Sequence, residues 1–552
     1  MIDGALGITS ALALLACAPA SQEAPASTTG QDERPQLGGI MHLAVPSGPE
    51  TLDPYFTAGG GAVTSLQRLV YDGLLDYKQE GPEDDFRASF TPTPWLAEKW
   101  SLENPTSYLF SLRKDVQWHD GHPFSSADVV FSYERMLNPD NRFRNRGLLG
   151  DVQGIEAVDS HTVRLLRKEP SAEFLANLAS SPALAILPKH VADRGDDFKK
   201  TAIGTGPFKL HAFDSIKGAS LGKNQSYWQQ GKPYLDGVRL FYGLDRSGLI
   251  AALVARNSDF YNVPDKGQFD TIKAARPDMQ YKPYHIEYNY GGRFNITKPP
   301  FNDIRVRRAL NLAVDRQEMV QIVTFGLGGI NQPGAPSIVK DWAIPEPEFL
   351  AMPGWRQPKE PDLAEAKRLL SEAGYPNGLK TTLLFYTTNS SQRELAEALS
   401  GQLKRIGVDA VLGGTDEAVV RKAYIDGAYE ITLSGGPISV PPDAGLRADW
   451  HSKGGLNKSG VADPVLDGLI ERQSVALDPA ERNRILLEIN RRVTDQHYFL
   501  ALVAGAYFTA WQPYVKDLYL NYAGQAWFRR PAEVWLDPSA GLPQGRTLEG
   551  GR

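Results

Sequence analysis

The sequence predicts an α/β protein with a mixed sheet that is built from more than one domain. Its 552 residues are too many for one ordinary hydrophobic core. After residue 300, segments with helical periodicity alternate with short apolar segments typical of strands, which indicates an α/β domain. Glycine-punctuated β structure is expected before that point, for example in residues 204–228.

Short strands and helices are expected along the first half of the chain. A strand after residue 38 runs into a turn at Pro46–Pro49, and residues 62–77 have the spacing of a helix. Asn104-Pro105 is expected to form the turn of a hairpin, because apolar residues alternate along the strand that follows. Further helices are expected at about 126–137 and 172–180, and a further strand at 161–167.

The second half is expected to alternate helix and strand. Helices are expected at 301–323, 362–375, 391–407 and 481–496, strands at 380–388, 408–413 and 429–434, and a buried apolar stretch at 498–511. Asp362 and Glu365 are placed for a capping box at the start of the second of these helices. The basic residues of the first helix are expected to form a solvated face; they are Arg305, Arg307, Arg308 and Arg316.

Composition and charge exclude some classes of protein. The formal net charge is −6, whereas a nucleic-acid-binding protein normally has a basic surplus. No apolar run approaches the roughly twenty residues needed to span a bilayer. Cys17 is the single cysteine, so no disulfide is expected to stabilise the folded domains.

The N-terminus predicts export from the cytoplasm. Residues 1–17 resemble a signal peptide with a lipobox, in which Leu14-Leu15-Ala16 precedes a lipid-modified Cys17, and residues 18–37 are typical of a disordered tether. The alternative is an ordinary signal peptide cut after Ala18-Pro19-Ala20. Residues 1–7 lack the usual Lys or Arg, so a start further upstream stays open.

Two clusters have the residue types of catalytic or metal sites. Gly218–Gly222 matches the GxSxG motif of serine hydrolases, but the residues around it are typical of β structure, so Ser220 is expected in a hairpin strand. His119, Asp120 and His122 lie close together, yet a zinc site needs a third or fourth ligand from elsewhere. A turn followed by a helix capped near Ser125 is the favoured interpretation. No metal, cofactor or catalytic residue is therefore predicted.

The segment "LAEKWSLENPTSYLFSLRKDVQWHDGHPFSSADVVFSYERML" resembles the signature region of family 5 bacterial extracellular solute-binding proteins. These are the peptide- and nickel-binding components of ABC importers. Further segments resemble the family in the same order along the chain, including "IGTGPFKL", "LGKNQSYWQQGKPYLDGV" and "FNITKPPFNDIRVRRALNLAVDR". The resemblance covers residues 39–537.

The resemblance implies an α/β fold of the two-lobed periplasmic-binding-protein clamshell type (type II, large cluster) with an additional inserted domain. Closure of the lobes by hinge motion encloses the ligand. The implied parts are lobe one at 38–80, 200–293 and 512–545, the inserted domain at 81–199, lobe two at 294–511 and a tail at 546–552. The chain is expected to cross between the lobes near Arg293–Asn295 and Phe508–Gln512.

The resemblance also places the ligand site. Many peptide-binding members carry an Asp that holds the α-amino group of the ligand, and Val440 stands at about that position here. A buried ammonium without a counter-charge is costly, so a larger or modified peptide is favoured over a free dipeptide. The expected ligand-binding residues are Tyr55, Phe56, Phe294, Asn295, Ser434, Gly435, Gly436, Pro437, Asp443 and Trp450. Arg447 and Asp449 either reach the ligand or line a surface loop.

The predicted function is therefore that of a non-enzymatic, extracytoplasmic solute-binding protein. It is expected to be a monomer, periplasmic or anchored through Cys17, that captures an oligopeptide or modified peptide and delivers it to an ABC permease. Alternatives are a sugar, opine or nickel chelate as the ligand, a receptor that signals rather than transports, and a secreted hydrolase that uses Ser220.

Overall fold

The computed structural model describes residues 34–56, 61–78, 91–180, 183–263, 266–324, 326, 328–335, 339–387, 390–435, 441–518 and 530–546. The fold below is that of residues 36–552, which form one compact unit. Cys17 and the predicted signal peptide lie outside the described residues, as do Gly436, Pro437 and Val440.

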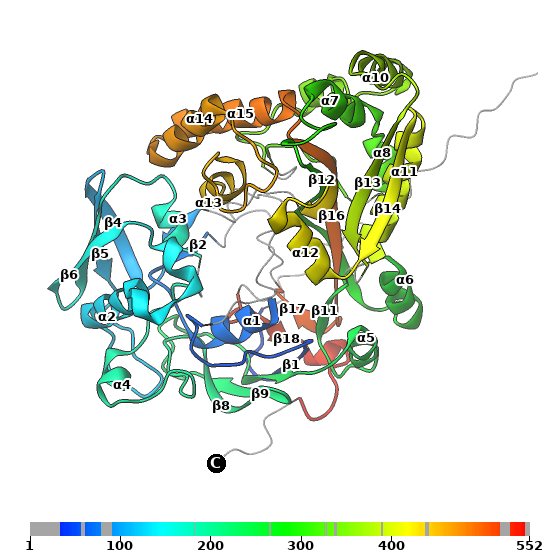
Figure 1. Ribbon diagram of the computed structural model, residues 1–552. Helices are drawn as coiled ribbons and strands as arrows, with labels where there is room; N and C mark the ends of the chain where they lie inside the picture. Colours follow the sequence, from blue (N-terminus) through cyan, green and yellow to red (C-terminus); the bar gives the residue numbers. More distant parts are fainter. Residues whose placement is uncertain are drawn as a thin grey trace, which may run out of the picture. The chain divides into compact units, whose positions relative to one another are not determined.

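Two four-stranded sheets come from the first half of the described chain (Figure 1). One has the order β1 (Ile40–Ala44), β10 (Gly237–Phe241), β9 (Gly218–Lys223) and β8 (Phe208–Asp214), with β1 parallel to β10. The other is antiparallel, with the order β4 (Ala97–Asn104), β5 (Ser107–Leu112), β7 (Thr162–Arg167) and β6 (Val152–Asp159). Short pairs are formed by β2 (Leu75–Tyr77) with β3 (Pro92–Pro94) and by β17 (Val515–Lys516) with β18 (Trp535–Leu536).

A six-stranded mixed sheet unites strands from distant parts of the chain. Its order is β11 (Phe260–Val263), β16 (Phe499–Trp511), β12 (Gln280–Phe294), β15 (Ile431–Gly435), β13 (Leu379–Tyr386) and β14 (Val408–Thr415). β13 lies parallel to β14 and β15, whereas β12 lies antiparallel to β15 and β16. The mixed sheet expected from the alternating sequence is thus confirmed.

The helices of the first half are α1 (Gly61–Val70), α2 (Ser126–Leu137), α3 (Phe174–Leu178), α4 (Lys189–Asp193), α5 (Arg246–Val254) and α6 (Lys266–Ala275). Those of the second half are α7 (Ile304–Ala313), α8 (Arg316–Val323), α9 (Glu346–Ala351), α10 (Glu360–Glu372), α11 (Ser390–Lys404), α12 (Glu417–Asp426), α13 (Asp443–Gly445), α14 (Pro464–Val475) and α15 (Pro479–Asp495). Within the described ranges, no helix has the length and apolar character needed to cross a membrane.

One hydrophobic core joins the predicted lobe one to the predicted inserted domain. It runs without a break from Met41 on β1 through Phe110 on β5 to Leu187, and on to Val534. A separate core holds α7, α8, α10 and α11 against β13, and another holds α14 and α15. The 81–199 segment therefore buries its apolar side chains together with those of lobe one.

Several local expectations are confirmed. The hairpin turn lies at Pro105-Thr106, since Asn104 pairs with Ser107. Ser220 lies inside β9 and pairs with Arg239 of β10 and Ala212 of β8, so it is not on a strand-to-helix turn. α2 begins after Ser125, whose N–H donates to the carboxylate of Asp128 at 2.9 Å, as the capping pattern predicted.

Other expectations were wrong. The helix expected at 301–323 is two helices, α7 and α8, because the Asp315 carboxylate caps a new helix by accepting the Glu318 N–H at 3.1 Å. The capping box at Asp362 does not form, since α10 begins earlier. The Asp362 carboxylate is buried and instead accepts from Lys359 Nζ at 2.9 Å and from the Gly354 N–H at 2.8 Å.

The predicted solvated basic face is also only half correct. Arg305 and Arg308 are exposed, but Arg307 and Arg316 are buried. The Arg316 guanidinium donates to the carbonyl oxygens of Ala501 at 2.8 Å and Gly354 at 2.6 Å, among others. Backbone carbonyls accept hydrogen bonds from both guanidinium groups, and the Asn311 side chain also accepts one from Arg316, which makes their burial tolerable.

Candidate ligand-binding region

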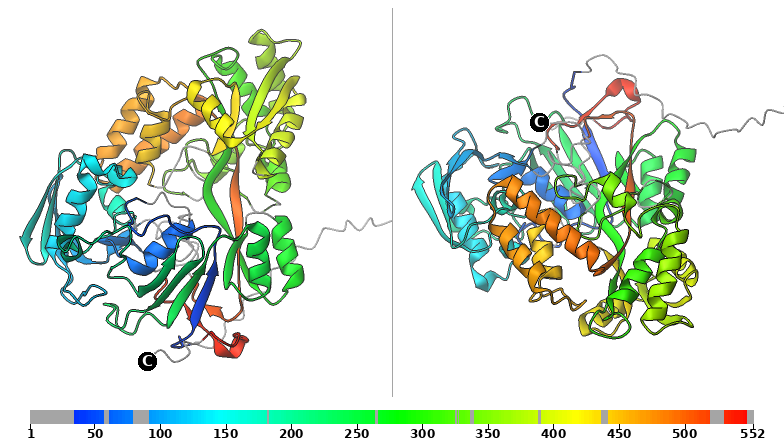
Figure 2. Two further views of the ribbon diagram at one scale, coloured as in Figure 1. Left: turned by 60° about the horizontal axis from the view of Figure 1, so that its bottom comes forward. Right: turned by 90° about the horizontal axis from the view of Figure 1, so that it is seen from above.

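The paired strands β12 and β16 lie between β11 and β15 in the six-stranded sheet (Figures 1 and 2). Gln280 pairs with Trp511 at one end, beside β11, and Arg293 pairs with Phe499 at the other, beside β15. Arg293–Asn295 and Phe508–Gln512, the expected crossing points, thus lie at opposite ends of one antiparallel ribbon. The register shift between His285 and Asn289 lies between them, and the assignment of lobes to residue ranges stays a prediction.

Ser434 and Gly435 lie at the carboxyl end of β15. Gly435 pairs with Tyr290 and Ser434 pairs with Gly291, so the end of β15 meets β12 just beyond that register shift. The packing there is close, because a Cβ added at Gly291 would lie 2.1 Å from Cζ of Phe499. The predicted ligand-binding end of β15 therefore lies next to the ribbon formed by β12 and β16.

Phe294 and Asn295 lie at the other end of β15. Phe294 is fully buried and stacks on Phe301, with ring centroids 5.2 Å apart. The Asn295 amide donates to the carbonyl oxygens of Gly427 at 3.0 Å and Tyr429 at 3.3 Å. Asn295 also borders a hollow of about 350 Å³ lined by Lys298, Pro299, Phe301, Thr382, Leu384, Ala428, Tyr429 and Glu430.

The structure does not bring these two predicted groups together. Phe294 pairs with Ile431 at the start of β15, whereas Tyr290 pairs with Gly435 at its end. A strand rises about 3.3 Å per residue, so the two groups are separated by roughly 13 Å along the strand. Phe294 and Asn295 are moreover buried, and the Asn295 amide already donates to Gly427 and Tyr429, so only Ser434 and Gly435 stay in the proposed site.

Tyr55 and Phe56 follow β1 but lie in different surroundings. Tyr55 is 1% exposed, and its hydroxyl donates to the Ala185 carbonyl at 2.6 Å. Burial raises the pKa of this hydroxyl far above its usual value. Phe56 is 42% exposed and lies against Phe143, with the Lys199 ammonium 4.5 Å from its ring centroid. Tyr55 is thus placed as a core residue, and Phe56 remains accessible.

Asp443 begins α13 and joins two parts of the chain that are far apart in sequence. Its carboxylate accepts from Arg447 Nε at 3.1 Å and from the Gln473 side chain. Its backbone N–H donates to Oε1 of Glu173 at 2.8 Å. Asp443 already has a cation beside it in Arg447, which is 44% exposed.

Glu173 is the centre of this contact. It is buried, and the Arg482 guanidinium of α15 forms an ion pair with it. Burial raises the pKa of the Glu173 carboxyl, while Arg482 lowers it. The neighbouring Ala172 N–H donates to the Ser474 carbonyl at 2.8 Å, so the segment before α3 is bound to α13, α14 and α15. We call Glu173, Asp443 and Arg482 the bridging cluster.

Asp449 and Trp450 lie inside the second half of the chain. Asp449 forms an ion pair with Arg293 of β12 at 2.8 Å, and burial raises the pKa of its carboxyl. Trp450 is 3% exposed and packs near Tyr498 and Phe499. The indole N–H of Trp450 has no hydrogen-bond partner among the described residues. The ion pair of Asp449 with Arg293 therefore ties this segment to β12. Trp450 is part of the hydrophobic core that includes α14 and α15.

Sequence reasoning missed Glu173 and Arg482. They are 309 residues apart, and nothing near either one in the sequence indicates the other. The local sequence indicates only that Glu173 is a charged residue just before the short helix α3. Asp443 was predicted as a ligand contact, and the structure gives it the additional role of bridging.

Comparison with known proteins supports the resemblance. The family model "Bacterial extracellular solute-binding proteins, family 5 Middle" matches residues 91–457. The glutathione-binding protein GsiB of Salmonella typhimurium is 30% identical over 388 residues, which cover 70% of this chain and 71% of GsiB.

Solved structures share the fold. The ABC transporter substrate binding protein CtaP from Listeria monocytogenes superposes with a TM-score of 0.78 at 22% identity, over 91% of this chain and 100% of CtaP. The periplasmic binding protein DppA from Helicobacter pylori, in complex with the peptide STSA, superposes with a TM-score of 0.70 at 24% identity, over 91% of this chain and 98% of DppA. The predicted fold class is confirmed, and the chain belongs to family 5 of the bacterial extracellular solute-binding proteins.

Proposed function

We propose that this protein is the extracytoplasmic binding component of an ABC importer and that it captures a peptide or modified peptide. The family match over residues 91–457 carries the proposal. A relative that binds glutathione and a structure with a bound tetrapeptide support a peptide-like ligand. The protein itself performs no chemistry in this role, which agrees with the position of Ser220 inside a paired strand.

The bridging cluster supports capture by closure. Glu173 belongs to the predicted inserted domain, which shares a core with lobe one, whereas Asp443 and Arg482 belong to predicted lobe two. Contacts of this kind form when lobes close and break when they open. The cluster therefore stabilises the closed form, and the ligand supplies the remaining free energy of closure.

Mass spectrometry of the ligand released from freshly purified protein tests the proposal. A peptide-like mass is expected, followed by calorimetric binding of the synthetic peptide. A sugar, opine or metal chelate, released reproducibly and rebound by the emptied protein, would contradict the peptide ligand while leaving the importer role intact. If neither the released molecules nor a panel of peptides bind, the capture function fails.

Location at the membrane is a separate part of the proposal. Lipid modification of Cys17 would hold the protein at the membrane surface, and the family places it outside the cytoplasm. Expression of the chain and of a Cys17→Ser variant, followed by fractionation, tests this. The unchanged chain is expected with the membranes and the variant in the soluble fraction, and identical fractionation would contradict lipidation.

A further inference from the structure

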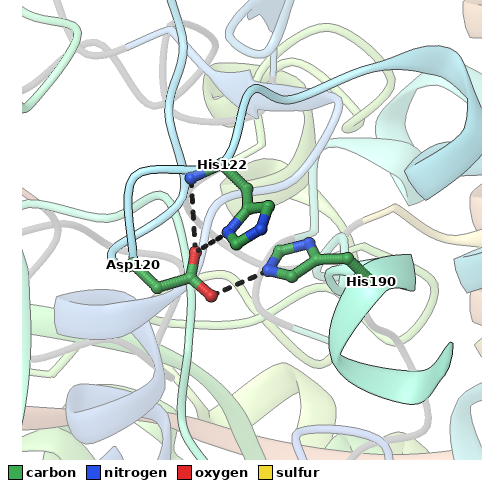
Figure 3. Close-up of side chains that lie close together, drawn as sticks. All are labelled: Asp120, His122 and His190. Atoms are coloured by element: carbon green, nitrogen blue, oxygen red, sulfur yellow. Dashed lines mark hydrogen bonds and ion pairs between the residues drawn. The ribbon is translucent and has the colours of Figure 1, made fainter. Parts of the chain in front are cut away.

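Three side chains that are potential metal ligands meet at the turn before α2 (Figure 3). Asp120 and His122 come from the turn that the sequence predicted, and His190 comes from α4, 70 residues further along the chain. One ligand atom from each lies within 4.8 Å of the others. The turn alone lacked a third ligand from elsewhere in the sequence, and the fold supplies one.

The spacing of these atoms suits a small divalent ion. His190 Nε2 lies 2.8 Å from Asp120 Oδ2, and His122 Nδ1 lies 3.3 Å from Asp120 Oδ1. Zinc binds nitrogen and oxygen at about 2.0–2.2 Å in a tetrahedral arrangement, so neighbouring ligand atoms lie roughly 3.3–3.6 Å apart around it. The two imidazole rings are stacked, with centroids 4.0 Å apart and planes at 19°. The His122–Asp120 separation thus matches this spacing, and the His190–Asp120 separation is about 0.5 Å shorter.

The backbone around the ligands is well held. Gly121 has a φ of +88° in the turn, which is closed by a hydrogen bond from the Trp118 N–H to the His122 carbonyl at 2.8 Å. α4 is fixed to α2, because the Lys189 N–H donates to Asp128 Oδ1 at 2.8 Å. The site thus bridges two supported segments, as preorganised binding requires.

The Asp120 carboxylate brings one negative charge to this position, and a positive side chain lies beside it. The Arg194 guanidinium, 3.7 Å from Asp120 Oδ2, is the neighbouring positive charge that a metal ion has to compete with. The His122 side chain is 53% exposed, so water can complete the coordination of a bound ion.

We infer that Asp120, His122 and His190 bind one divalent ion of the class that imidazole nitrogen prefers, with Zn²⁺ as its representative. Two nitrogens and one carboxylate oxygen favour such an ion over Ca²⁺ and Mg²⁺, which take mostly oxygen ligands. A bound ion ties the 120–122 turn to α4 and stabilises this part of the protein. The inference does not depend on which ligand the protein transports.

Titration of Zn²⁺ into the tag-free, chelator-treated protein tests the inference by calorimetry, with thermal unfolding as a second readout. One ion per chain is expected, together with a rise in melting temperature. His190→Ala and His122→Ala should each weaken binding at least tenfold, and the matched control His211→Ala, on exposed β8, should bind like the unchanged protein. Equal affinity in all four proteins, or no binding to any, would overturn the inference.

Arg194→Gln separates a metal site from a purely structural cluster. Removing the competing guanidinium should tighten Zn²⁺ binding several-fold, because the carboxylate then faces the ion alone. Unchanged or weaker binding would contradict the proposed geometry. His122→Ala decides the case if His190→Ala fails to fold, since the His122 side chain is half exposed and its loss leaves the His190–Asp120 contact in place.

Discussion

Glu173→Gln is the substitution that addresses the bridging cluster most directly. It keeps the shape of the side chain and an acceptor oxygen for the Asp443 N–H, but it removes the charge that pairs with Arg482. If the cluster forms on closure, the substitution weakens ligand binding. It then leaves the stability of the ligand-free, open protein almost unchanged.

The magnitude follows from the burial of the pair. The side chains of Glu173 and Arg482 are 5% and 15% exposed, and removing one partner of a buried pair typically costs about 3–5 kcal/mol. Arg482 keeps its hydrogen bond to Gln473 Oε1 at 3.1 Å, which reduces the loss. We expect about 2 kcal/mol, which corresponds to about a 30-fold loss of ligand affinity.

Isothermal titration calorimetry with the peptide recovered from the purified protein measures this loss, and urea unfolding without ligand measures stability. Glu103→Gln is the matched control, because Glu103 of β4 forms an exposed ion pair with Arg164 of β7, across β5, and its substitution should leave both quantities unchanged. A normal ligand affinity in Glu173→Gln, combined with reduced stability of the ligand-free protein, would refute closure. The cluster would then be a permanent part of the fold.

Three further predictions concern the packing, the pH dependence of stability and the ligand site. Gly291→Ala should lower the free energy of unfolding by about 1–3 kcal/mol, because the new Cβ would collide with Phe499. Gly468→Ala should raise it by about 0.5–1 kcal/mol, because this glycine lies inside α14 with open space around it. Urea unfolding measures both, and a change in the same direction for the two variants would contradict the packing. Burial, together with nearby arginines, lowers the pKa of His497 to about 3. Below about pH 6.5 the unfolded chain therefore takes up a proton that the folded chain does not, and stability falls by about 1 kcal/mol between pH 7 and pH 5.5. His497→Asn should remove this contribution, and identical pH slopes in the two proteins would contradict it. With Val440 at the expected amine-binding position, N-acetylated peptides should bind as tightly as free ones in calorimetry, and a loss of several kcal/mol on acetylation would disprove that idea.

The sequence predicted those parts of the fold that depend on neighbouring residues. The hairpin at Asn104, the cap at Ser125 and the strand at Ser220 each depend on residues a few positions away. The family resemblance then predicted the fold class. Each matching segment alone is weak evidence for the family, but several segments in the same order along the chain identify it.

Residues whose partners are distant in sequence were predicted poorly. The charge pattern around Arg307 and Arg316 indicates a solvent-exposed helix face. Both side chains are instead buried, and they donate hydrogen bonds to carbonyl oxygens 190 and 185 residues away. Tyr55 was expected at the ligand, yet its hydroxyl bonds to a carbonyl 130 residues away. The partners in the bridging cluster are likewise far apart in sequence, and so are His190 and the turn that carries Asp120 and His122.

The position of β16 in the six-stranded sheet determines when the protein is able to fold. This strand lies between β11 and β12, although both of those precede it by more than two hundred residues. Until residues 499–511 have been synthesised, β11 and β12 lack the strand that joins them, and the β12–β16 ribbon does not exist. Folding dominated by such long-range pairing is slow. The chain is therefore expected to stay incompletely folded until its last tenth has been made.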